Sequence, residues 1–385
     1  MHVVVIGAGV VGTSVAAELA ERGTRVTVLE RDLPGGGTSA TSYAWVNANG
    51  KEPEPYFRLN HAGVRAHHEL GGSGTEWFAP RGHLEVAADE AHEHHLARRV
   101  ASLRERGYPT EEVPLRRVQE LVPDLVLPDD ARLAVLFPEE AHVFPLPYLG
   151  MMLGRARRAG AEIRTGAEVT ALEPAGTGGR VRTADGSTIA ADAVVLATGR
   201  WTGEVAQSAG TTVPLIDYGA PGDITVGFLA VTNPLPTSVD RLLTTPWLNV
   251  RPAGGGRLLL QALDLDKEAA PDSVPAPTSP LAQEFLRRLR TALLGTEGAR
   301  IEQLVVGRRV MPADGLTIAG TTPEQPWLYA VATHSGVTLA PFLGKAVAGE
   351  VLGEEEPRLA PFRPGRFAAG MTGPGPRSPR RPGEQ

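Results

Sequence analysis

Cysteine is absent from the 385 residues of this chain. Its absence excludes disulfide bridges, thiolate catalysis, zinc sites built on cysteine, and a flavin linked to the protein through cysteine. Lysine is also scarce, whereas arginine, alanine, glycine and proline are abundant. This bias is typical of a GC-rich genome and says nothing about function.

Long apolar runs are missing as well, so we expect no membrane span. The net charge of −6 argues against nucleic acid as a partner. The chain enters an apolar strand almost from its first residue, which leaves no room for a cleavable signal peptide. We therefore expect a cytoplasmic protein. With 42% hydrophobic and 21% charged residues the composition is globular, and the length predicts two closely associated domains.

The first thirty residues carry the most informative pattern. Residues 3–6 form a continuous apolar run, which is typical of a strand buried on both faces of a parallel sheet. Gly7, Gly9 and Gly12 give the spacing G-x-G-x-x-G where that strand turns into a helix. Gly7 permits the tight turn, Gly9 lets the backbone approach a pyrophosphate, and Gly12 lets the helix pack closely on the strand. The helix amides and dipole then favour the phosphates.

A second predicted strand ends at Glu30, at the distance where a carboxylate can bind both hydroxyls of an adenosine ribose. Because this carboxylate would repel a 2′-phosphate, the pattern disfavours NADP. The alternative for the whole motif is a tight strand–helix turn without a ligand. The pattern therefore favours a dinucleotide whose ribose is unphosphorylated.

Three later segments extend this pattern. Residues 31–42 are rich in glycine and hydroxylated side chains, which indicates either a loop beside a cofactor or a flexible surface loop. Residues 193–201 predict a second buried parallel strand that returns to the same sheet edge. Residues 327–333 predict a third, followed by a glycine turn at Gly336 and a helix from about 340 to 352. We thus expect two strand–turn–helix units around one ligand.

Histidines cluster on two predicted helices, at positions 61, 67 and 68 and at positions 92, 94 and 95. A helical metal site usually needs two ligands at i and i+4, and the second cluster lacks that spacing. We interpret it as a solvated helix face and expect no metal. Proline, glycine and arginine dominate residues 363–385, which predicts a disordered tail.

Four stretches of the chain resemble the flavin-dependent amine oxidases of the D-amino-acid oxidase (DAO) superfamily, which includes glycine oxidase, sarcosine oxidase and D-amino-acid dehydrogenase. The stretches are residues 3–30, 193–201, 247–260, and 306–320 with its continuation at 332–344. The first motif is shared with many flavoproteins. The later Arg-x-x-x-x-Asp-Gly at 309–315 is much more specific.

The resemblance implies non-covalent FAD, with its isoalloxazine ring between the two domains. Hydride would pass from the carbon beside an amine nitrogen to flavin N5, and water would hydrolyse the resulting imine. The implied FAD-binding residues are Gly7, Gly9, Val11, Gly12, Glu30, Arg31, Thr38, Ser39, Thr41, Ser42, Val169, Thr198, Gly199, Trp201, Gly336, Val337 and Thr338.

The resemblance also implies catalytic residues. Arg309 falls where the family places an arginine that holds the substrate carboxylate, with Arg308 as its competitor on the opposite face of the strand. His334 either faces the flavin or is a buried histidine bonded to backbone. Tyr218 and Asn47 are candidates for the pocket wall. Arg251 is either a second anion contact or part of an ion pair on a strand.

The expected fold is α/β, with a Rossmann-like, three-layer FAD-binding domain interleaved with an α+β substrate-binding domain built on an antiparallel sheet. The expected domain bounds are residues 1–45, 140–205 and 300–362 for FAD, and 46–139 and 206–299 for substrate. The expected partners are an amine or amino acid and an electron acceptor, oxygen or another. Two alternatives remain: an NAD-linked dehydrogenase, and a flavin-binding subunit of a larger complex.

Overall fold

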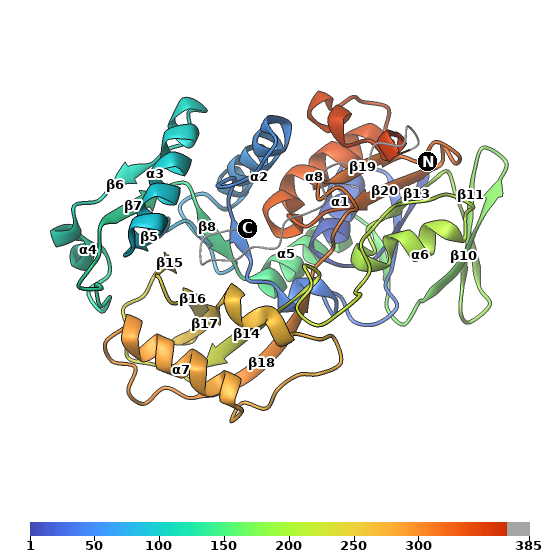
Figure 1. Ribbon diagram of the computed structural model, residues 1–385. Helices are drawn as coiled ribbons and strands as arrows, with labels where there is room; N and C mark the ends of the chain where they lie inside the picture. Colours follow the sequence, from blue (N-terminus) through green and yellow to red (C-terminus); the bar gives the residue numbers. More distant parts are fainter. Residues whose placement is uncertain (368–385) are drawn as a thin grey trace.

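The computed structural model describes residues 1–367, and a six-stranded sheet lies at the centre of one half of it (Figure 1). The strand order is β19-β20-β13-β1-β2-β9. The strands are β1 (His2–Ile6), β2 (Arg25–Leu29), β9 (Glu162–Arg164), β13 (Ala193–Leu196), β19 (Ile318–Thr321) and β20 (Leu328–Ala332). All neighbouring pairs are parallel except β19 and β20. The predicted parallel sheet, with the three apolar strands side by side, is confirmed.

Strand β1 is buried on both faces, as its apolar run predicted. Val3 and Val5 pack in a core with helices α1 (Val10–Glu21), α5 (Pro145–Arg158) and α8 (Gly336–Val351). Val4 and Ile6 pack on the other face. That face is covered by helix α6 (Thr202–Gln207) and an antiparallel sheet of β10 (Val169–Ala175), β11 (Gly178–Thr183) and β12 (Thr188–Ala191). The result is a three-layer arrangement of helices, parallel sheet and antiparallel sheet.

The other half of the molecule is built on an eight-stranded sheet in the order β18-β14-β17-β16-β15-β5-β7-β6. The strands are β5 (His83–Ala87), β6 (Glu111–Glu112), β7 (Leu133–Phe137), β14 (Val226–Thr232), β15 (Leu242–Thr244), β16 (Asn249–Gly254), β17 (Arg257–Gln261) and β18 (Ile301–Arg308). β5 and β15 pair in parallel, and the other pairs are antiparallel. Figure 1 shows helix α7 (Pro280–Ala292) lying along this sheet. Phe285, Leu286 and Leu289 of α7 pack on the sheet.

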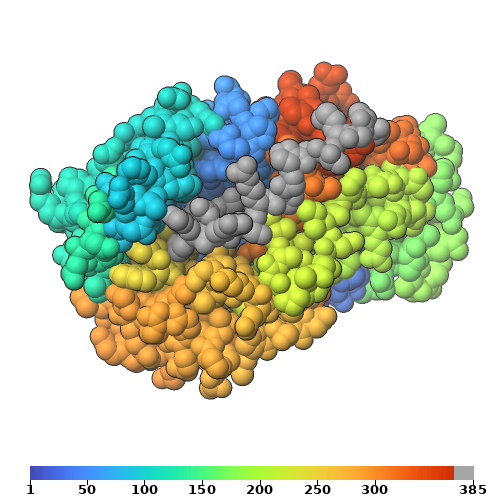
Figure 2. Space-filling view, in the orientation of Figure 1, coloured from blue at the N-terminus to red at the C-terminus, as the bar shows by residue number. Residues whose placement is uncertain are grey.

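Shorter elements connect the two halves. Strands β3 (Trp45–Val46), β8 (Ala141–Val143) and β4 (Phe78–Ala79) form a small antiparallel sheet. In the chain, helix α2 (Glu54–Gly71) lies between β3 and β4, and helices α3 (Glu90–Glu105) and α4 (Leu115–Leu121) lie between β4 and β8. On the face shown in Figure 2 little of the dark blue of the first forty residues is visible, in keeping with the burial of β1 and α1.

Three features differ from the sequence-based expectation. Strand β18 falls in the segment 300–362 assigned to FAD binding, yet it pairs with β14 of the eight-stranded sheet. Helix α2 falls in the segment 46–139 assigned to substrate binding, yet its Leu59 and Val64 share the core of α1 and α8. Helix α8 begins at Gly336 rather than near 340. In each case the position or the start of the element depends on pairing or packing with residues that are distant in the chain.

The predicted disordered tail is also corrected at its start. Residues Pro364–Phe367 form a short 3₁₀ helix. Arg366 binds Asp314 there through Nε at 2.7 Å, and Arg363 pairs with Glu350. These ion pairs hold the segment on the six-stranded half. The remainder of the prediction, 368–385, lies outside the described residues.

Candidate active site

A cavity of about 1100 Å³ lies between the six-stranded and eight-stranded sheets. One wall comes from the segments that follow β1, β2, β13 and β20, at the carboxyl ends of these parallel strands. The other wall comes from β14, β17 and β18. In open α/β sheets ligands bind at this edge, so the cavity stands where the sequence predicted it.

The glycine turn after β1 has the geometry that its spacing predicted. Gly7 has φ of +99°, which L-residues rarely adopt, and a Cβ added there would lie 2.5 Å from the carbonyl oxygen of Ala197. A Cβ on Gly12 would overlap the carbonyl oxygen of Gly7. Gly9 faces the loop 31–42, because a Cβ added to Gly9 would lie 3.2 Å from Ser39 Oγ. The turn is therefore tight, and helix α1 starts directly against it.

Glu30 lies in the cavity wall at the end of β2. Its Oε2 accepts a hydrogen bond from the Ala8 amide at 2.8 Å, and its Oε1 accepts one from the Asp32 amide at 3.0 Å. These two bonds orient the carboxylate beside the glycine turn. Since each carboxylate oxygen can accept more than one bond, Glu30 can still bind hydroxyl groups.

The loop 31–42 is fixed to both halves of the molecule. Thr38 Oγ1 donates to the Arg308 carbonyl oxygen at 2.6 Å, at the end of β18. Ser39 Oγ accepts from the Val10 amide at 3.2 Å, at the first turn of α1. Trp201 lies between two guanidinium groups, those of Arg31 and Arg200, at 3.8 and 3.6 Å from its ring. The interpretation as a loop beside the cavity is supported over a free surface loop.

Helix α8 presents its first turn to the same cavity as α1. A Cβ on Gly336 would lie 3.9 Å from Val11 Cγ2, and a Cβ on Gly344 would lie 2.8 Å from Ser14 Cβ. The two helices therefore cross closely, with their N-termini adjacent. The first amides of a helix have no intrahelical partner, and its dipole is positive there. One cavity is thus lined by two helix N-termini.

Contacts with α2 and with the backbone of β3 position the first turn of α8. His67 Nε2 donates to the Val337 carbonyl oxygen at 2.8 Å, and burial lowers the pKa of His67 to about 4. Thr338 Oγ1 donates to the Trp45 carbonyl oxygen at 3.1 Å. Ser335 Oγ and Tyr56 Oη form a buried hydrogen bond at 2.9 Å. These contacts explain why α2 packs with the six-stranded half.

Arg309 lies in the cavity wall directly after β18. Its Nη1 donates to the carbonyl oxygens of Ile224 and Val226 at 3.0 and 2.5 Å, and its Nη2 donates to Asp266 Oδ2 at 3.1 Å. Asp266 is buried, which raises its pKa although Arg309 opposes the shift. Asp266 does not line the cavity, so it holds the guanidinium from behind.

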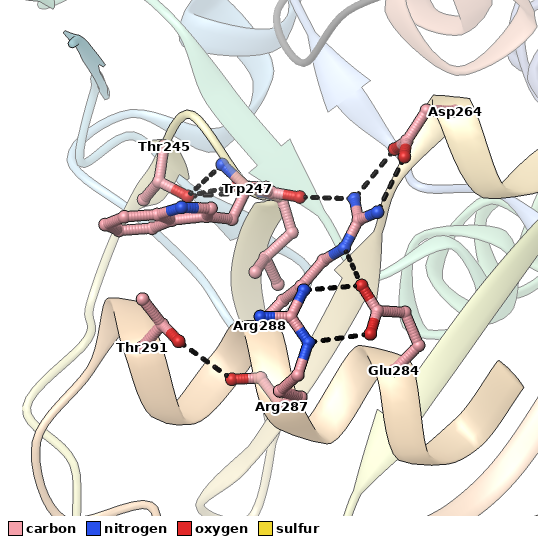
Figure 3. A network of polar contacts seen from close by, with 8 residues as sticks. Thr245, Trp247, Asp264, Glu284, Arg287, Arg288 and Thr291 are labelled. Atoms are coloured by element: carbon pink, nitrogen blue, oxygen red, sulfur yellow. Dashed lines mark hydrogen bonds and ion pairs between the residues drawn. The ribbon is translucent and has the colours of Figure 1, made fainter. Parts of the chain in front are cut away.

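The short helix that carries Asp266, η3 (Leu263–Glu268), is itself fixed to α7 (Figure 3). Arg288 Nη1 and Nη2 bind Asp264 at 2.7 and 2.6 Å, and Nη1 also donates to the Trp247 carbonyl oxygen at 2.9 Å. Glu284 accepts from Arg288 Nε at 2.8 Å. The orientation of Arg309 therefore depends on a chain of ion pairs that reaches the surface of the eight-stranded half.

His334 lines the cavity immediately before α8. Burial lowers its pKa to about 3, with smaller contributions from the positive charges of Lys51 and Arg309. Among the described residues no hydrogen-bond partner is recorded for its ring. His334 thus lines the cavity, and among residues 1–367 the alternative bond from its ring to the backbone is not recorded.

Lys51 is a cavity residue that the sequence analysis did not single out. It lies between β3 and α2 and is only 6% exposed. Burial lowers its pKa to about 8, an effect that the negative charge of Glu140 opposes. The one signal for Lys51 in the sequence was that lysine is a rare residue type in this chain. No motif marks it.

Most of the predicted site residues line the cavity. Gly12 and Tyr218 do not: Gly12 packs behind the turn, and Tyr218 is 40% exposed outside the cavity, which corrects its placement in the site. Asn47 is buried behind the wall. Arg251 binds the carbonyl oxygens of Tyr43 and Pro252 at 2.5 and 2.6 Å. No carboxylate within residues 1–367 pairs with it, so the proposed strand ion pair is not found.

Among residues 1–367, no group of three or more histidine, aspartate or glutamate side chains could hold a metal ion. No described helix is long and apolar enough to cross a bilayer. The cavity itself fits an extended dinucleotide: a carboxylate at one end, a glycine turn in the middle, and a second helix N-terminus beyond it.

Comparisons with known proteins agree with the fold. A family model described as FAD dependent oxidoreductase (DAO) matches residues 2–350. The chain is 27% identical to glycine oxidase of Bacillus licheniformis, over 91% of this chain and 92% of that protein. It is 26% identical to one of the subunits of opine oxidase from Agrobacterium tumefaciens, over 95% of this chain and 97% of that protein.

The crystal structure of glycine oxidase from Geobacillus kaustophilus has the same fold. Its TM-score is 0.81 at 24% identity, covering 94% of this chain and 97% of that chain. The family match assigns FAD as the cofactor and sets aside the alternative of an NAD-linked dehydrogenase. From its opening glycine turn to helix α8, the chain belongs to the DAO family of FAD dependent oxidoreductases.

Proposed function

We propose that this enzyme oxidises the C–N bond of an amino acid or a related small amine. Bound FAD would supply the hydride acceptor for the carbon beside the amine nitrogen, and water would hydrolyse the imine that remains. The observation that carries the proposal is Arg309, a guanidinium held in the wall of the cavity that the N-terminus of α8 also lines. The names of the relatives, glycine oxidase and opine oxidase, support it.

Arg309 would bind the substrate carboxylate. Three of its N–H groups are held by Asp266 and two carbonyl oxygens, which fixes the plane of the guanidinium. Among residues 1–367 no acceptor is recorded for Nε, so Arg309 keeps donors for a ligand. A prearranged guanidinium binds a planar carboxylate with little loss of side-chain entropy.

His334 and helix α8 would complete the site. With a pKa of about 3, His334 is neutral at physiological pH and can accept a hydrogen bond from an amine N–H. The N-terminus of α8 would favour negative charge on a group bound beside it. Neither group needs to carry a proton if the amine arrives neutral.

The test is flavin reduction without oxygen. Purified protein loaded with FAD is mixed with a panel of amino acids and N-methyl amino acids, and the visible flavin absorption is followed. We expect at least one compound to bleach the flavin. If no amine of the panel reduces bound FAD, the proposed function is wrong.

A second reading is a flavin-binding subunit of a larger complex. The observation in its favour is that the opine oxidase relative is itself named as one subunit of an enzyme. The same assay separates the two readings, because bleaching by the isolated chain shows that its own cavity completes the reaction. The electron acceptor, oxygen or another, is found by adding candidate acceptors to the reduced protein.

A further inference from the structure

A row of polar side chains crosses the eight-stranded sheet and ends at the cavity. Its members, on four strands that are neighbours in the sheet, are His83 on β5, Thr244 on β15, Asn249 on β16 and Gln261 on β17. Thr244 lies directly opposite Asn249, and Asn249 lies directly opposite Gln261, so these three side chains share one face of the sheet. Of the four residues in the row, only Gln261 lines the cavity.

Hydrogen bonds connect the row from its interior end to the cavity. His83 Nε2 lies 2.9 Å from Thr244 Oγ1, which in turn donates to Asn249 Oδ1 at 2.8 Å. Asn249 Nδ2 then donates to Gln261 Oε1 at 3.2 Å. At the interior end, a carboxylate oxygen of the buried Glu140 lies 3.1 Å from His83 Nδ1. His83, Thr244 and Asn249 are at most 2% exposed, so packing holds the inner part of the row in place.

The direction of these bonds fixes the amide group of Gln261. Thr244 has one hydroxyl proton and donates it to the oxygen of Asn249, so the amide nitrogen of Asn249 faces Gln261. The oxygen of Gln261 is thereby used as an acceptor, and its Nε2 remains a donor. Within residues 1–367 no acceptor is recorded for Nε2. The row therefore ends in two N–H donors on a side chain of the cavity wall.

The row lies on the side of the sheet that faces the cavity. Leu259 is two residues before Gln261 on β17 and therefore shares its face. Leu259 packs in one buried cluster with Tyr43 and Trp45, and these two aromatic residues also line the cavity. The neighbours of Gln261 on its own face are therefore apolar, and its amide is a polar group in an otherwise hydrophobic part of the wall.

The separation of Gln261 from Arg309 suits an amino acid that reaches both. β14 lies between β17 and β18, so the two residues are two strand spacings apart across the sheet. The residue before Gln261 pairs with Ala230 of β14, and the residue before Arg309 pairs with Val226. These offsets place the two Cα atoms roughly 15 Å apart. Since both side chains are long, a substrate whose carboxylate is bound by Arg309 can extend its own side chain to Gln261.

We propose that Gln261 is a specificity-determining residue, which donates an N–H to an oxygen atom on the substrate side chain, and that Asn249 is the residue that positions it. The preferred substrates are then amino acids whose side chain carries an oxygen acceptor. This inference rests on the proposed function. A substrate without that oxygen leaves the half-buried amide without a partner, so it binds less tightly than one that carries it.

The test uses methionine and methionine sulfoxide, which differ by one oxygen acceptor on the side chain. Both enantiomers of each are titrated without oxygen into protein loaded with FAD, and changes in the visible flavin spectrum give the dissociation constants. The preference is the constant for methionine divided by the constant for the sulfoxide. We expect Gln261→Met to lower the preference at least ~fivefold, the size of one hydrogen bond. Gln283→Met is the matched control, because Gln283 is an exposed glutamine on α7, and it should leave the preference unchanged.

Asn249→Leu tests the positioning role. It keeps Gln261 but removes the bond that orients its amide, so the preference should fall at least ~twofold. A wild-type preference in this variant would remove Asn249 from the role. If Asn249→Leu does not fold, Gln261→Met still decides.

Three results would overturn the role of Gln261. One is a wild-type preference in Gln261→Met, even if both compounds bind more weakly. Another is a loss of FAD affinity in Gln261→Met with no change in preference, which would assign the side chain to the cofactor. The third is that neither compound binds. If another amine still reduces the flavin, the proposed function stands while this inference falls.

Discussion

At the scale of single residues, the site depends on how each charge is held. Glu30 is oriented by two backbone amides, and Arg309 by one buried carboxylate and two carbonyl oxygens. The glycine-turn residues and Glu30 could be predicted because their roles depend on neighbours within thirty positions. The partner of Arg309 could not, since Asp266 lies 43 positions away and no local pattern links them.

Removing Arg309 should weaken substrate binding. Arg309→Ala takes away the guanidinium and leaves Asp266 as an unpaired buried carboxylate, so KM for an amino acid should rise at least roughly tenfold if binding is near equilibrium. Steady-state kinetics measure it. Arg308→Ala is the control, because Arg308 pairs with the exposed Asp272 at 2.8 Å. An unchanged KM in Arg309→Ala, or an equal rise in both variants, would remove Arg309 from the role.

At the scale of elements, the site is where separate segments are brought to one place. Helix α8 starts four residues earlier than its sequence indicated, because β20 leads directly into it and Thr338 binds the backbone of β3. Strand β18 carries Arg309 into the site only because it pairs with β14. Periodicity predicts that such strands and helices exist, whereas their partners depend on contacts between distant residues.

The network in Figure 3 predicts an effect of α7 on the site. Arg288→Met removes the ion pair to Asp264 and the bond to Trp247, so we expect a loss of ~1–3 kcal/mol in the free energy of unfolding and a higher KM through Arg309. Urea unfolding and kinetics measure both. Arg287→Met serves as the control, because the Arg287 side chain is 63% exposed and in this network bonds Glu284 alone, so its effect should stay within ~0.5 kcal/mol. Equal effects of the two variants would contradict the account.

The glycine turn gives a second prediction for an element. Gly12→Ala places a methyl group on the carbonyl oxygen of Gly7, so α1 must move away from the turn. We expect FAD binding to be lost, and the overpacking to cost ~1–3 kcal/mol of stability. Gly150→Ala on α5 is the matched control, because a Cβ there meets nothing within 4 Å. Equilibrium dialysis against FAD measures the difference, and normal FAD binding by Gly12→Ala would refute it.

At the scale of the whole molecule, burial of neutral histidines makes stability depend on pH. Burial lowers the pKa of His67 to about 4 and that of His142 to about 3, so the unfolded chain binds their protons first as the pH falls. The unfolding free energy should therefore decrease below pH ~6.5, by up to ~1.4 kcal/mol per pH unit for each histidine. Glu85, whose pKa is lowered to about 2 beside Arg99 and His92, adds to the loss below pH ~4.5.

Urea unfolding at pH 7, 6 and 5 measures this dependence. His142→Leu removes one titrating group and should make the slope shallower. Among residues 1–367 neither ring nitrogen of His142 has a hydrogen-bond partner, so the substitution breaks no recorded bond. A stability that stays constant or rises between pH 7 and 5 would contradict this account of the buried histidines.

The sequence predicted the half with the six-stranded sheet much better than the half with the eight-stranded sheet. Apolar strands with glycine turns predict a parallel sheet and its ligand edge, because that geometry repeats within short segments. The eight-stranded sheet combines residues from 83 to 308, and its order follows from no local signal. Lys51 could not be predicted as a cavity residue for the same reason, because the packing of α2 on α8 places it there.

The most direct test of the account is a crystal structure of the protein with FAD. We predict one FAD molecule in the cavity, with its adenosine ribose at Glu30, its pyrophosphate at the glycine turn, and its ring at the first turn of α8. An FAD bound elsewhere, or one whose ring lies away from α8, would contradict the central claim.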